Sequence, residues 1–233
     1  MSETSPTIAD HYNALLDVIR QHEQQCHRTP GSVRLLAVSK TQPASRVLAA
    51  WAAGARDFGE NYVQEALEKM RELSVPAPDI TWHFIGPIQS NKTRDLAAHF
   101  DWVHSVDRLK ILQRLQDQRA AELPALNICI QVNLSNEDSK SGVTLQEARE
   151  LCAAASRLDR LCLRGLMAIP APCQDHQQQR AAFRPLAQLF TEMRQLYASM
   201  DTLSMGMSDD YAAAIAEGST MIRIGTALFG KRN

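Results

Sequence analysis

The chain has 233 residues, of which 45% are hydrophobic, and its formal net charge is -1. This length allows one or two domains with a sizeable core, and a near-neutral charge without a basic run gives no electrostatic footprint for nucleic acid or for a membrane surface. No apolar stretch approaches the ~18 residues that span a bilayer, and the N-terminus lacks the basic start and apolar block of a signal peptide.

Strand and helix patterns alternate along the chain after an amphipathic opening helix over about 7–27. The predicted strands share an apolar, partly β-branched composition, and they cover 33–39, 56–60, 80–86, 102–106, 126–134, 161–169, 202–206 and 220–224. The predicted helices follow them at 46–53, 62–73, 91–100, 108–122, 145–158, 175–199 and 208–217. Asp107 is expected to cap the helix at 108–122, and Thr144 with Glu147 predicts a capping box for the helix at 145–158.

Eight strands that alternate with helices favour parallel pairing with helical crossovers. Eight such units close into a (β/α)8 TIM barrel, which typically needs ~250 residues. Because the chain shows no linker and no shift in composition, we predict one domain over 1–233, with the extra helix in 1–30 packed on the barrel. The alternative is an open doubly wound sheet, but no predicted strand ends in a G-x-G-x-x-G loop.

The five cysteines and seven histidines give little sign of a metal site. No two cysteines form a C-x-x-C pair, and the histidines lack the spacing of metal ligands. The cysteines in apolar patterns are expected to pack as small hydrophobic side chains. We therefore expect no metal and a reduced, cytoplasmic compartment.

Lys40 is the most informative single residue, because it ends the apolar strand at 33–39. Active sites of such barrels lie at the carboxyl ends of the strands. An ammonium that is partly desolvated there shifts toward its neutral form, which is a nucleophile for carbonyl groups and aldehyde cofactors. A solvated lysine at a surface strand end is the plainer alternative.

Polar and conformationally special residues at the last two strand ends suggest an anion site. Ser208 stands where a helix is predicted to begin, and unpaired N–H groups at a helix start favour an anion. Gly225 lets the backbone approach a ligand closely, and Thr226 adds an N–H and a hydroxyl. A phosphate site facing a strand-end lysine fits pyridoxal 5'-phosphate (PLP), which needs an amine for a Schiff base and a cradle for its phosphate. A helix cap and a simple turn are the alternatives for these residues.

Nine short stretches in order along the chain resemble the pyridoxal-phosphate homeostasis proteins of the YggS/PROSC type, whose fold is similar to the barrel domain of alanine racemase. Each stretch is weak alone, but their order is specific. They are 37–41, 58–65, 83–92, 103–107, 131–133, 137–142, 165–170, 203–210 and 221–226. The pair at 87–88 departs from the usual leucine-containing stretch, and this change touches no chemical group of the site.

The resemblance implies a role for seven residues, all of them cofactor-binding. It implies that Lys40 holds PLP as a Schiff base and that Ser208, Gly225 and Thr226 hold the phosphate. It places Arg223 beside the pyridine nitrogen. It places Asn61 and Met167 along the ring pocket. Since arginine only donates hydrogen bonds, such a neighbour disfavours protonation of the ring nitrogen and makes the ring a weaker electron sink. A barrel-interior salt bridge is the alternative for Arg223.

Two further functions remain open beside a PLP carrier without catalytic residues. A PLP-dependent amino-acid racemase needs acid/base groups on both faces of the reacting carbon. The alanine racemases take the second group from a tyrosine on a separate C-terminal domain, and we expect no such domain here. The tyrosines at 62 and 211 and the histidines at 83 and 104 are the weaker candidates for that role. A cofactor-free aldolase that acts on a sugar phosphate would use the same barrel.

The expected partners follow from the carrier interpretation. They are PLP itself and, as recipients, PLP-dependent apo-enzymes. No stripe of exposed apolar residues marks an interface, so we expect a monomer. Lys140, in the predicted loop at 135–142, is either a solvated charge or a residue that holds or releases a second cofactor.

Overall fold

The computed structural model describes residues 6–135 and 141–230. Its eight strands follow one another along the chain with helices between them. The strands are β1 (Arg34–Val38), β2 (Asp57–Glu60), β3 (Thr81–Phe84), β4 (Trp102–Val106), β5 (Leu126–Val132), β6 (Leu161–Ala168), β7 (Thr202–Ser204) and β8 (Met221–Ile224). The helices are α1 (Ile8–Gln25), α2 (Ala44–Ala52), α3 (Val63–Leu73), the 3-10 turn η1 (Ser90–Lys92), α4 (Thr93–His99), α5 (Leu109–Gln118), α6 (Leu145–Ala155), α7 (His176–Leu196), α8 (Tyr211–Ala216) and α9 (Thr226–Phe229).

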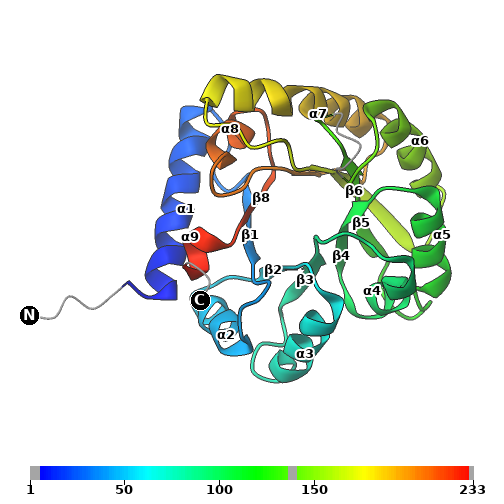
Figure 1. Cartoon of the computed structure of the whole chain (residues 1–233), viewed down its shortest axis with the longest axis horizontal. Coiled ribbons are helices and arrows are strands. Elements are labelled where there is room, and N and C mark those ends of the chain that lie inside the picture. The colour runs from blue at the N-terminus through cyan, green and yellow to red at the C-terminus, as the bar shows by residue number, and fades with distance from the viewer. Residues whose placement is uncertain (1–5, 136–140, 231–233) are drawn as a thin grey trace, which may run out of the picture.

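The strands form a closed barrel in the order β1 to β8, and every neighbouring pair is parallel. β8 closes the ring against β1, with Leu36 opposite Arg223. Figure 1 looks down this barrel and shows the helices as an outer ring. The predicted (β/α)8 fold is therefore confirmed. Closure matters for function because it brings all eight strand ends to one mouth.

The leading helix α1 lies outside the ring, beside α2, α8 and α9 (Figure 1). Thr7 and Asp10 start it with a reciprocal capping box, in which each side chain accepts from the other residue's backbone N–H. Ile19 is its buried apolar contact with the core. Glu23, also buried, accepts backbone N–H bonds from Gly31 and Val33, which ties the helix to the start of β1.

Close packing fills the barrel below the mouth. Gly165 on β6 is an example, because a Cβ at this position would collide with the backbone carbonyl of Thr202 on β7. Trp102 on β4 stacks on the His83 ring with centroids 5.2 Å apart, and the guanidinium groups of Arg34 and Arg164 lie over its ring. The interior is thus a packed core, and an open site is confined to the strand ends.

Several predicted boundaries change in the structure. The Thr144–Glu147 capping box is confirmed at the start of α6. The prediction for Asp107 was wrong, because Arg108 is the N-cap of α5 and the Asp107 carboxylate instead accepts from the Arg108 side chain. The helix expected at 208–217 starts only at Tyr211, since the Asp210 side chain closes a turn by accepting from the Met207 N–H.

Residues 6–135 and 141–230 lack both a membrane-spanning helix and a metal-binding cluster. In these ranges no helix has both the length and the apolar character needed to cross a bilayer. The same residues contain no cluster of His, Cys, Asp and Glu that could bind a metal ion.

Candidate functional site

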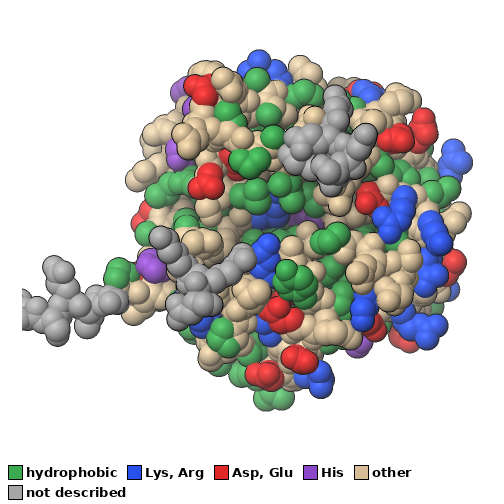
Figure 2. Space-filling model, in the orientation of Figure 1, with side chains coloured by type: hydrophobic (Ala, Val, Ile, Leu, Met, Phe, Trp, Pro, Cys, Tyr) green, Lys and Arg blue, Asp and Glu red, His purple; other side chains and the backbone are tan. Residues whose placement is uncertain are grey.

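A cavity of about 260 Å³ opens at the carboxyl ends of the strands. Its lining comes from the ends of β1, β2, β3, β6, β7 and β8: Val38, Lys40, Asn61, Ile85, Ile169, Met207, Ser208, Asp209, Arg223, Gly225 and Thr226. Figure 2 shows basic side chains in the central hollow of this face with hydrophobic side chains around it. Its size is close to the ~300 Å³ lower end of small-molecule sites.

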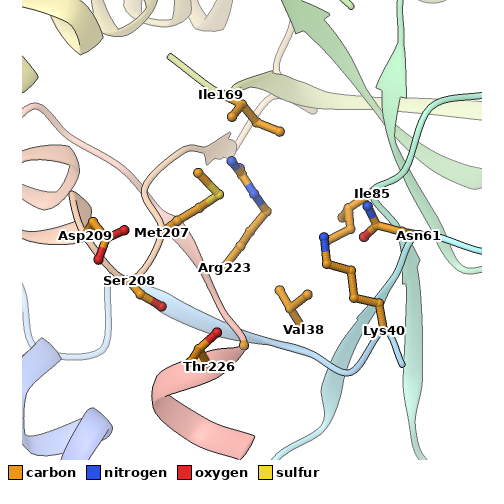
Figure 3. Close-up of a pocket in the computed structure, with 11 residues that line it drawn as sticks. Val38, Lys40, Asn61, Ile85, Ile169, Met207, Ser208, Asp209, Arg223 and Thr226 are labelled. Carbon is orange, nitrogen blue, oxygen red and sulfur yellow. The ribbon is translucent and has the colours of Figure 1, made fainter. Parts of the chain in front are cut away.

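Lys40 enters this cavity from the turn after β1, and Figure 3 shows its ammonium beside Asn61. The preceding residue, Ser39, is held in place by hydrogen bonds to two buried side chains. Ser39 is fully buried; its hydroxyl donates to Glu60 Oε1 at 2.6 Å, and its carbonyl accepts from Lys69 Nζ at 2.7 Å. Lys69 comes from α3, so a helix outside the barrel holds the strand end that carries Lys40.

The residue after Lys40 is anchored by the same group of charges. Thr41 has a positive φ of 63°, which is rare for a β-branched residue. Its N–H donates to Glu65 Oε1 at 2.5 Å, and Lys69 Nζ donates to that oxygen at 2.6 Å. A sharp turn held on both sides therefore fixes the backbone of Lys40.

Lys69 and its two carboxylates form a buried charge cluster. Lys69 Nζ also donates to Glu60 Oε1 at 2.8 Å, and the side chains of Lys69 and Glu60 are 5% and 0% exposed. Burial raises the pKa of Glu60, although the adjacent Lys69 ammonium opposes the shift. The second oxygen of Glu60, Oε2, has no hydrogen-bond partner within the described residues.

Asn61 follows β2 and lines the cavity beside Lys40. Its backbone packs against Gly86, where a Cβ would collide with the Asn61 carbonyl. Its side-chain oxygen Oδ1 is buried and lacks a hydrogen-bond partner in the described part of the chain. A buried polar atom without a partner is costly, and this one belongs to a residue that lines the cavity.

Arg223 reaches the cavity from β8 and is 3% exposed. Nη1 donates to the carbonyl and the hydroxyl of Ser204 at 2.7 and 2.9 Å, and Nη2 donates to the Ala168 carbonyl at 3.0 Å. Burial lowers the pKa of Arg223 to about 10, so the group stays protonated at neutral pH. In the described chain these bonds involve only the terminal nitrogens, and Nε, which can also donate, takes part in none of them.

The opposite edge of the cavity consists of backbone and hydroxyl groups. Ser208 lies in the turn at 207–210 before α8, and Thr226 is the first residue of α9. Both helices are short, so the local N–H groups and hydroxyls, rather than a long helix dipole, characterise this edge. Gly225 separates it from β1, and a Cβ there would lie 3.2 Å from the Val38 carbonyl.

Six of the seven predicted site residues thus meet at one cavity, and Met167 does not line it. Met167 is 1% exposed and packs with Trp102 and Cys129 inside the barrel. It lies opposite Ser204 on β7, one layer below the mouth. Ile169, two residues further along and just after the end of β6, lines the cavity instead, because alternate residues of an extended chain point to the same face.

Sequence reasoning missed five lining residues. They are Val38, Ile85, Ile169, Met207 and Asp209. All five lie within two residues of a predicted site residue or at a strand end. Their position at the carboxyl end of a predicted barrel strand is therefore the feature that would have identified them. Asp209 is the unexpected one, because it adds a carboxylate close to the backbone groups of the anion edge.

The side chains weighed for acid/base chemistry lie elsewhere. Tyr62 is 57% exposed, and Tyr211 packs edge-on against His22 with ring centroids 5.6 Å apart. His83 and His104 are fully buried in the barrel interior. Among the described lining residues there is neither a tyrosine nor a histidine. Lys140 lies outside the described residues.

The comparisons with known proteins agree with this architecture. The family model described as alanine racemase, N-terminal domain, matches residues 12–233. The pyridoxal phosphate homeostasis protein of Escherichia coli K12 is 54% identical over 229 residues, which cover 97% of each chain. Its namesake from Pseudomonas aeruginosa is 56% identical over 228 residues, which cover 97% of this chain and 96% of the other.

Solved structures show the same barrel. PipY of Synechococcus elongatus PCC7942, solved with PLP bound, has a TM-score of 0.83 and 38% identity, covering 96% of this chain and 100% of PipY. Alanine racemase from Corynebacterium glutamicum, at 17% identity and a TM-score of 0.67, shares the fold; the match covers 96% of this chain and 61% of that enzyme.

Fold and site together define a (β/α)8 barrel of the alanine racemase N-terminal type with a lysine at the end of its first strand. The chain belongs to the family of pyridoxal phosphate homeostasis proteins.

Proposed function

We propose that this protein binds PLP in the cavity at the barrel mouth and serves intracellular PLP homeostasis. The single observation that carries the proposal is the meeting of Lys40 and Arg223 in one cavity with the backbone edge at Ser208 and Thr226 (Figure 3). A phosphorylated pyridine aldehyde needs three features: an amine to react with its aldehyde, a hydrogen-bond donor for its ring nitrogen, and N–H and hydroxyl groups to hold its phosphate. The names of the relatives and the PLP-bound PipY structure support the same cofactor.

The residues present fit this cofactor. The buried Asn61 Oδ1 lacks a partner in the described chain, as expected of an atom that faces a ligand. Arg223 offers a donor to a ring nitrogen, and the turn at Ser208 with the start of α9 offers N–H groups and hydroxyls to a phosphate. Val38, Ile85 and Ile169 supply apolar walls. When bound, PLP supplies an aldehyde for an amine and a conjugated ring that withdraws electrons.

Lys40 would hold the cofactor through a Schiff base, in which its amine nitrogen bonds to the aldehyde carbon and water leaves. Arg223 would keep the ring nitrogen unprotonated, because a guanidinium donates and does not accept. The clamp around Ser39 and Thr41 would aim Lys40, and Asn61 would line the ring. Each of these residues would bind or orient the cofactor.

A carrier explains this arrangement better than a racemase. Racemisation needs acid/base groups on both faces of a carbon. Lys40 could serve one face, but among the described residues no tyrosine or histidine lines the cavity. We therefore propose that the protein buffers PLP or delivers it to PLP-dependent apo-enzymes, acting as a monomer in the cytoplasm.

Borohydride reduction of the PLP-loaded protein followed by peptide mass spectrometry tests this proposal. We expect visible absorbance before reduction and a pyridoxyl adduct on the peptide that contains Lys40. Lys40→Ala should abolish both signals and leave the circular dichroism spectrum unchanged. Lys110→Ala, which alters an exposed lysine on α5, is the matched control and should retain both.

Three results would contradict the proposal. An adduct located on Lys92 or Lys140 would move the site. A colourless protein that reduction traps with a sugar phosphate would favour an aldolase. Rapid interconversion of L- and D-alanine by the loaded protein would establish a racemase, and a transfer assay with a PLP-dependent apo-enzyme should be run beside it.

A further inference from the structure

A chain of hydrogen bonds runs through the barrel interior from the floor of the cavity toward the opposite end. Arg223 Nη1 donates to Ser204 Oγ at 2.9 Å, and Ser204 Oγ lies 3.0 Å from His104 Nδ1. His104 Nε2 lies 2.9 Å from His83 Nδ1, and His83 Nε2 lies 2.9 Å from Asp57 Oδ1. These side chains come from β8, β7, β4, β3 and β2, so the chain crosses the barrel.

This hydrogen-bond chain is unusual because its middle members are completely buried. Ser204, His104 and His83 are fully buried, whereas the Asp57 side chain at the start of β2 keeps 22% of its exposure. Within the described residues, no carboxylate forms an ion pair with the buried Arg223 guanidinium, although the charge of Asp210, in the turn before α8, raises the pKa of Arg223 against the effect of burial. The chain therefore connects a buried cation at the cavity with a carboxylate at the other end of the barrel, through neutral groups alone.

The Asp57 end of the hydrogen-bond chain requires one direction for its hydrogens, and the Arg223 end is compatible with it. Arg223 can only donate, so the Ser204 hydroxyl accepts from it and can give its own hydrogen to His104 Nδ1. At the far end the Asp57 carboxylate accepts, so His83 Nε2 carries a hydrogen. His83 Nδ1 is then bare and accepts from His104 Nε2. Both imidazoles are neutral Nε2–H tautomers in this pattern, and every bond is satisfied.

The reverse direction would need a charged His83 or a protonated Asp57. Burial lowers the pKa of His83. Burial, together with the neighbouring His83 ring and the positive charges of Arg223 and Arg34, lowers the pKa of His104 well below its usual value. Burial opposes the shift at Asp57, but the hydrogen bond from His83 and nearby positive charge lower the pKa of this carboxyl. Neutral rings and an ionised Asp57 both favour the first direction.

We propose that Ser204, His104 and His83 are positioning residues: they link Arg223 to the remote counter-charge of Asp57 and fix the guanidinium at the floor of the cofactor cavity. The inference rests on the proposed function, because the cofactor is what Arg223 would face. Its physical advantage is that Arg223 donates only to neutral oxygens, while the charge of Asp210 acts on the guanidinium without a hydrogen bond. Hydrogen bonds in such a buried chain also polarise and strengthen one another.

Nitrogen-15 NMR of histidine-labelled, ligand-free protein tests the direction of the chain without any cofactor. The expected result at neutral pH is that His83 and His104 are neutral with the hydrogen on Nε2. Asp57→Ala should change the nitrogen shifts of His104, which Asp57 does not touch. An Nδ1–H tautomer, a charged ring in the wild type, or unchanged His104 shifts in Asp57→Ala would overturn the proposal.

A pair of buried-serine variants tests the consequence for the cofactor. Ser204→Ala should weaken retention of PLP about tenfold, the effect of losing a bond to a charged group. It should also merge the separate Nη signals of Arg223, since the guanidinium gains freedom to rotate. Ser219→Ala is the matched control, because its hydroxyl is equally buried and bonds only backbone carbonyls outside the cavity. It should change retention less than about twofold.

The outcomes separate this inference from the proposed function. If the wild-type protein forms no adduct on Lys40, the proposed function is wrong. The histidine nitrogen shifts of the ligand-free protein would then still decide the direction of the hydrogen-bond chain. A wild type that binds PLP normally, with Ser204→Ala retaining it as tightly and keeping resolved Nη signals, overturns the inference alone.

Discussion

Lys69 donates a hydrogen bond of 2.7 Å to the carbonyl of Ser39, the residue directly before Lys40. A lysine from an outer helix thus grips the strand end that presents another lysine to the cavity. Both ammonium groups lie at the same turn, yet their surroundings differ. Lys69 is paired with Glu60 and Glu65 and is almost fully buried, whereas Lys40 is half-buried and borders the cavity. Lys69 therefore holds the turn in place, and Lys40 is the lysine that would contact the ligand.

Lys69→Met should lower the free energy of unfolding by about 3–5 kcal/mol, because it leaves two carboxylates without their buried partner. It should also weaken retention of PLP, since the turn around Lys40 loses its anchor. Urea denaturation measures the first effect, and absorbance after gel filtration measures the second. Lys110→Met, at an exposed position, should change stability by no more than about 0.5 kcal/mol.

The double variant Lys69→Met with Glu60→Gln makes this prediction sharper. It removes one of the orphaned charges, so it should recover part of the stability lost in Lys69→Met. A double variant that is less stable than the single one would show that the cluster does not act through charge pairing.

Thr41→Asn should raise the free energy of unfolding by about 0.5–1 kcal/mol. Thr41 adopts a positive φ of 63°, which costs a β-branched residue more than it costs asparagine. The side chain is exposed, and the bond that its N–H donates to Glu65 is kept in the variant. Thermal and urea unfolding measure the change, and PLP retention should stay the same. A less stable variant would mean that the threonine side chain itself stabilises the turn.

Gly86→Ala should reduce PLP retention and stability together, because the new Cβ would collide with the Asn61 carbonyl and displace the residue that lines the cavity. Gly59→Ala is a matched control on the neighbouring strand. The atoms nearest to its Cβ would be side-chain atoms of Ile85, itself a wall of the cavity, and Leu36, at 3.1 and 3.3 Å; these can shift, so retention should fall less than in Gly86→Ala. Equal loss of retention in both variants would argue against a specific role of the Gly86–Asn61 contact.

Stability of the ligand-free protein should fall as the pH drops below about 6.5, the unfolded value for histidine. Burial lowers the folded-state pKa of His83 and His104, so the unfolded chain binds more protons in this range. Their contribution is complete above the unfolded pKa and is lost as the pH falls toward the folded values. Two protons give a slope of up to ~2.7 kcal/mol per pH unit.

Urea unfolding at a series of pH values measures this slope. His104→Gln should reduce it to about half, because one of the two buried rings is gone. His99→Gln, at an exposed position on α4, should leave it unchanged. A stability that stays constant below the unfolded histidine value would contradict the prediction.

Much of the fold was predictable because it depends on short-range patterns. Apolar β-runs at a regular spacing between helices gave eight strands, and the Thr144–Glu147 spacing gave the start of α6. A helix cap was not predictable where another side chain competes for the capping group. Asp107 is a residue type that often caps a helix, but its carboxylate accepts a hydrogen bond from the Arg108 side chain instead.

The candidate site shows the same division. Residues at or just after a β-run are expected at the mouth of a barrel, which is how Lys40, Asn61, Ser208, Gly225 and Thr226 could be chosen. Arg223 lies within its strand, and only the family resemblance pointed to it. Met167 could not be placed, because the choice between mouth and interior depends on the stagger between β6 and β7. Stagger is a property of the closed barrel, so it cannot be predicted from the sequence of a single strand.

The sequence alone determined the order of elements, the strand-end lysine and the family, since periodicity, caps and motifs are all read within a few residues. Tertiary structure alone decided that Lys69 anchors Ser39 and that His83, His104 and Ser204 connect Arg223 with Asp57. These partners lie on different strands and helices. They meet only because barrel closure brings distant segments together in a buried interior, where most polar atoms need a hydrogen-bond partner.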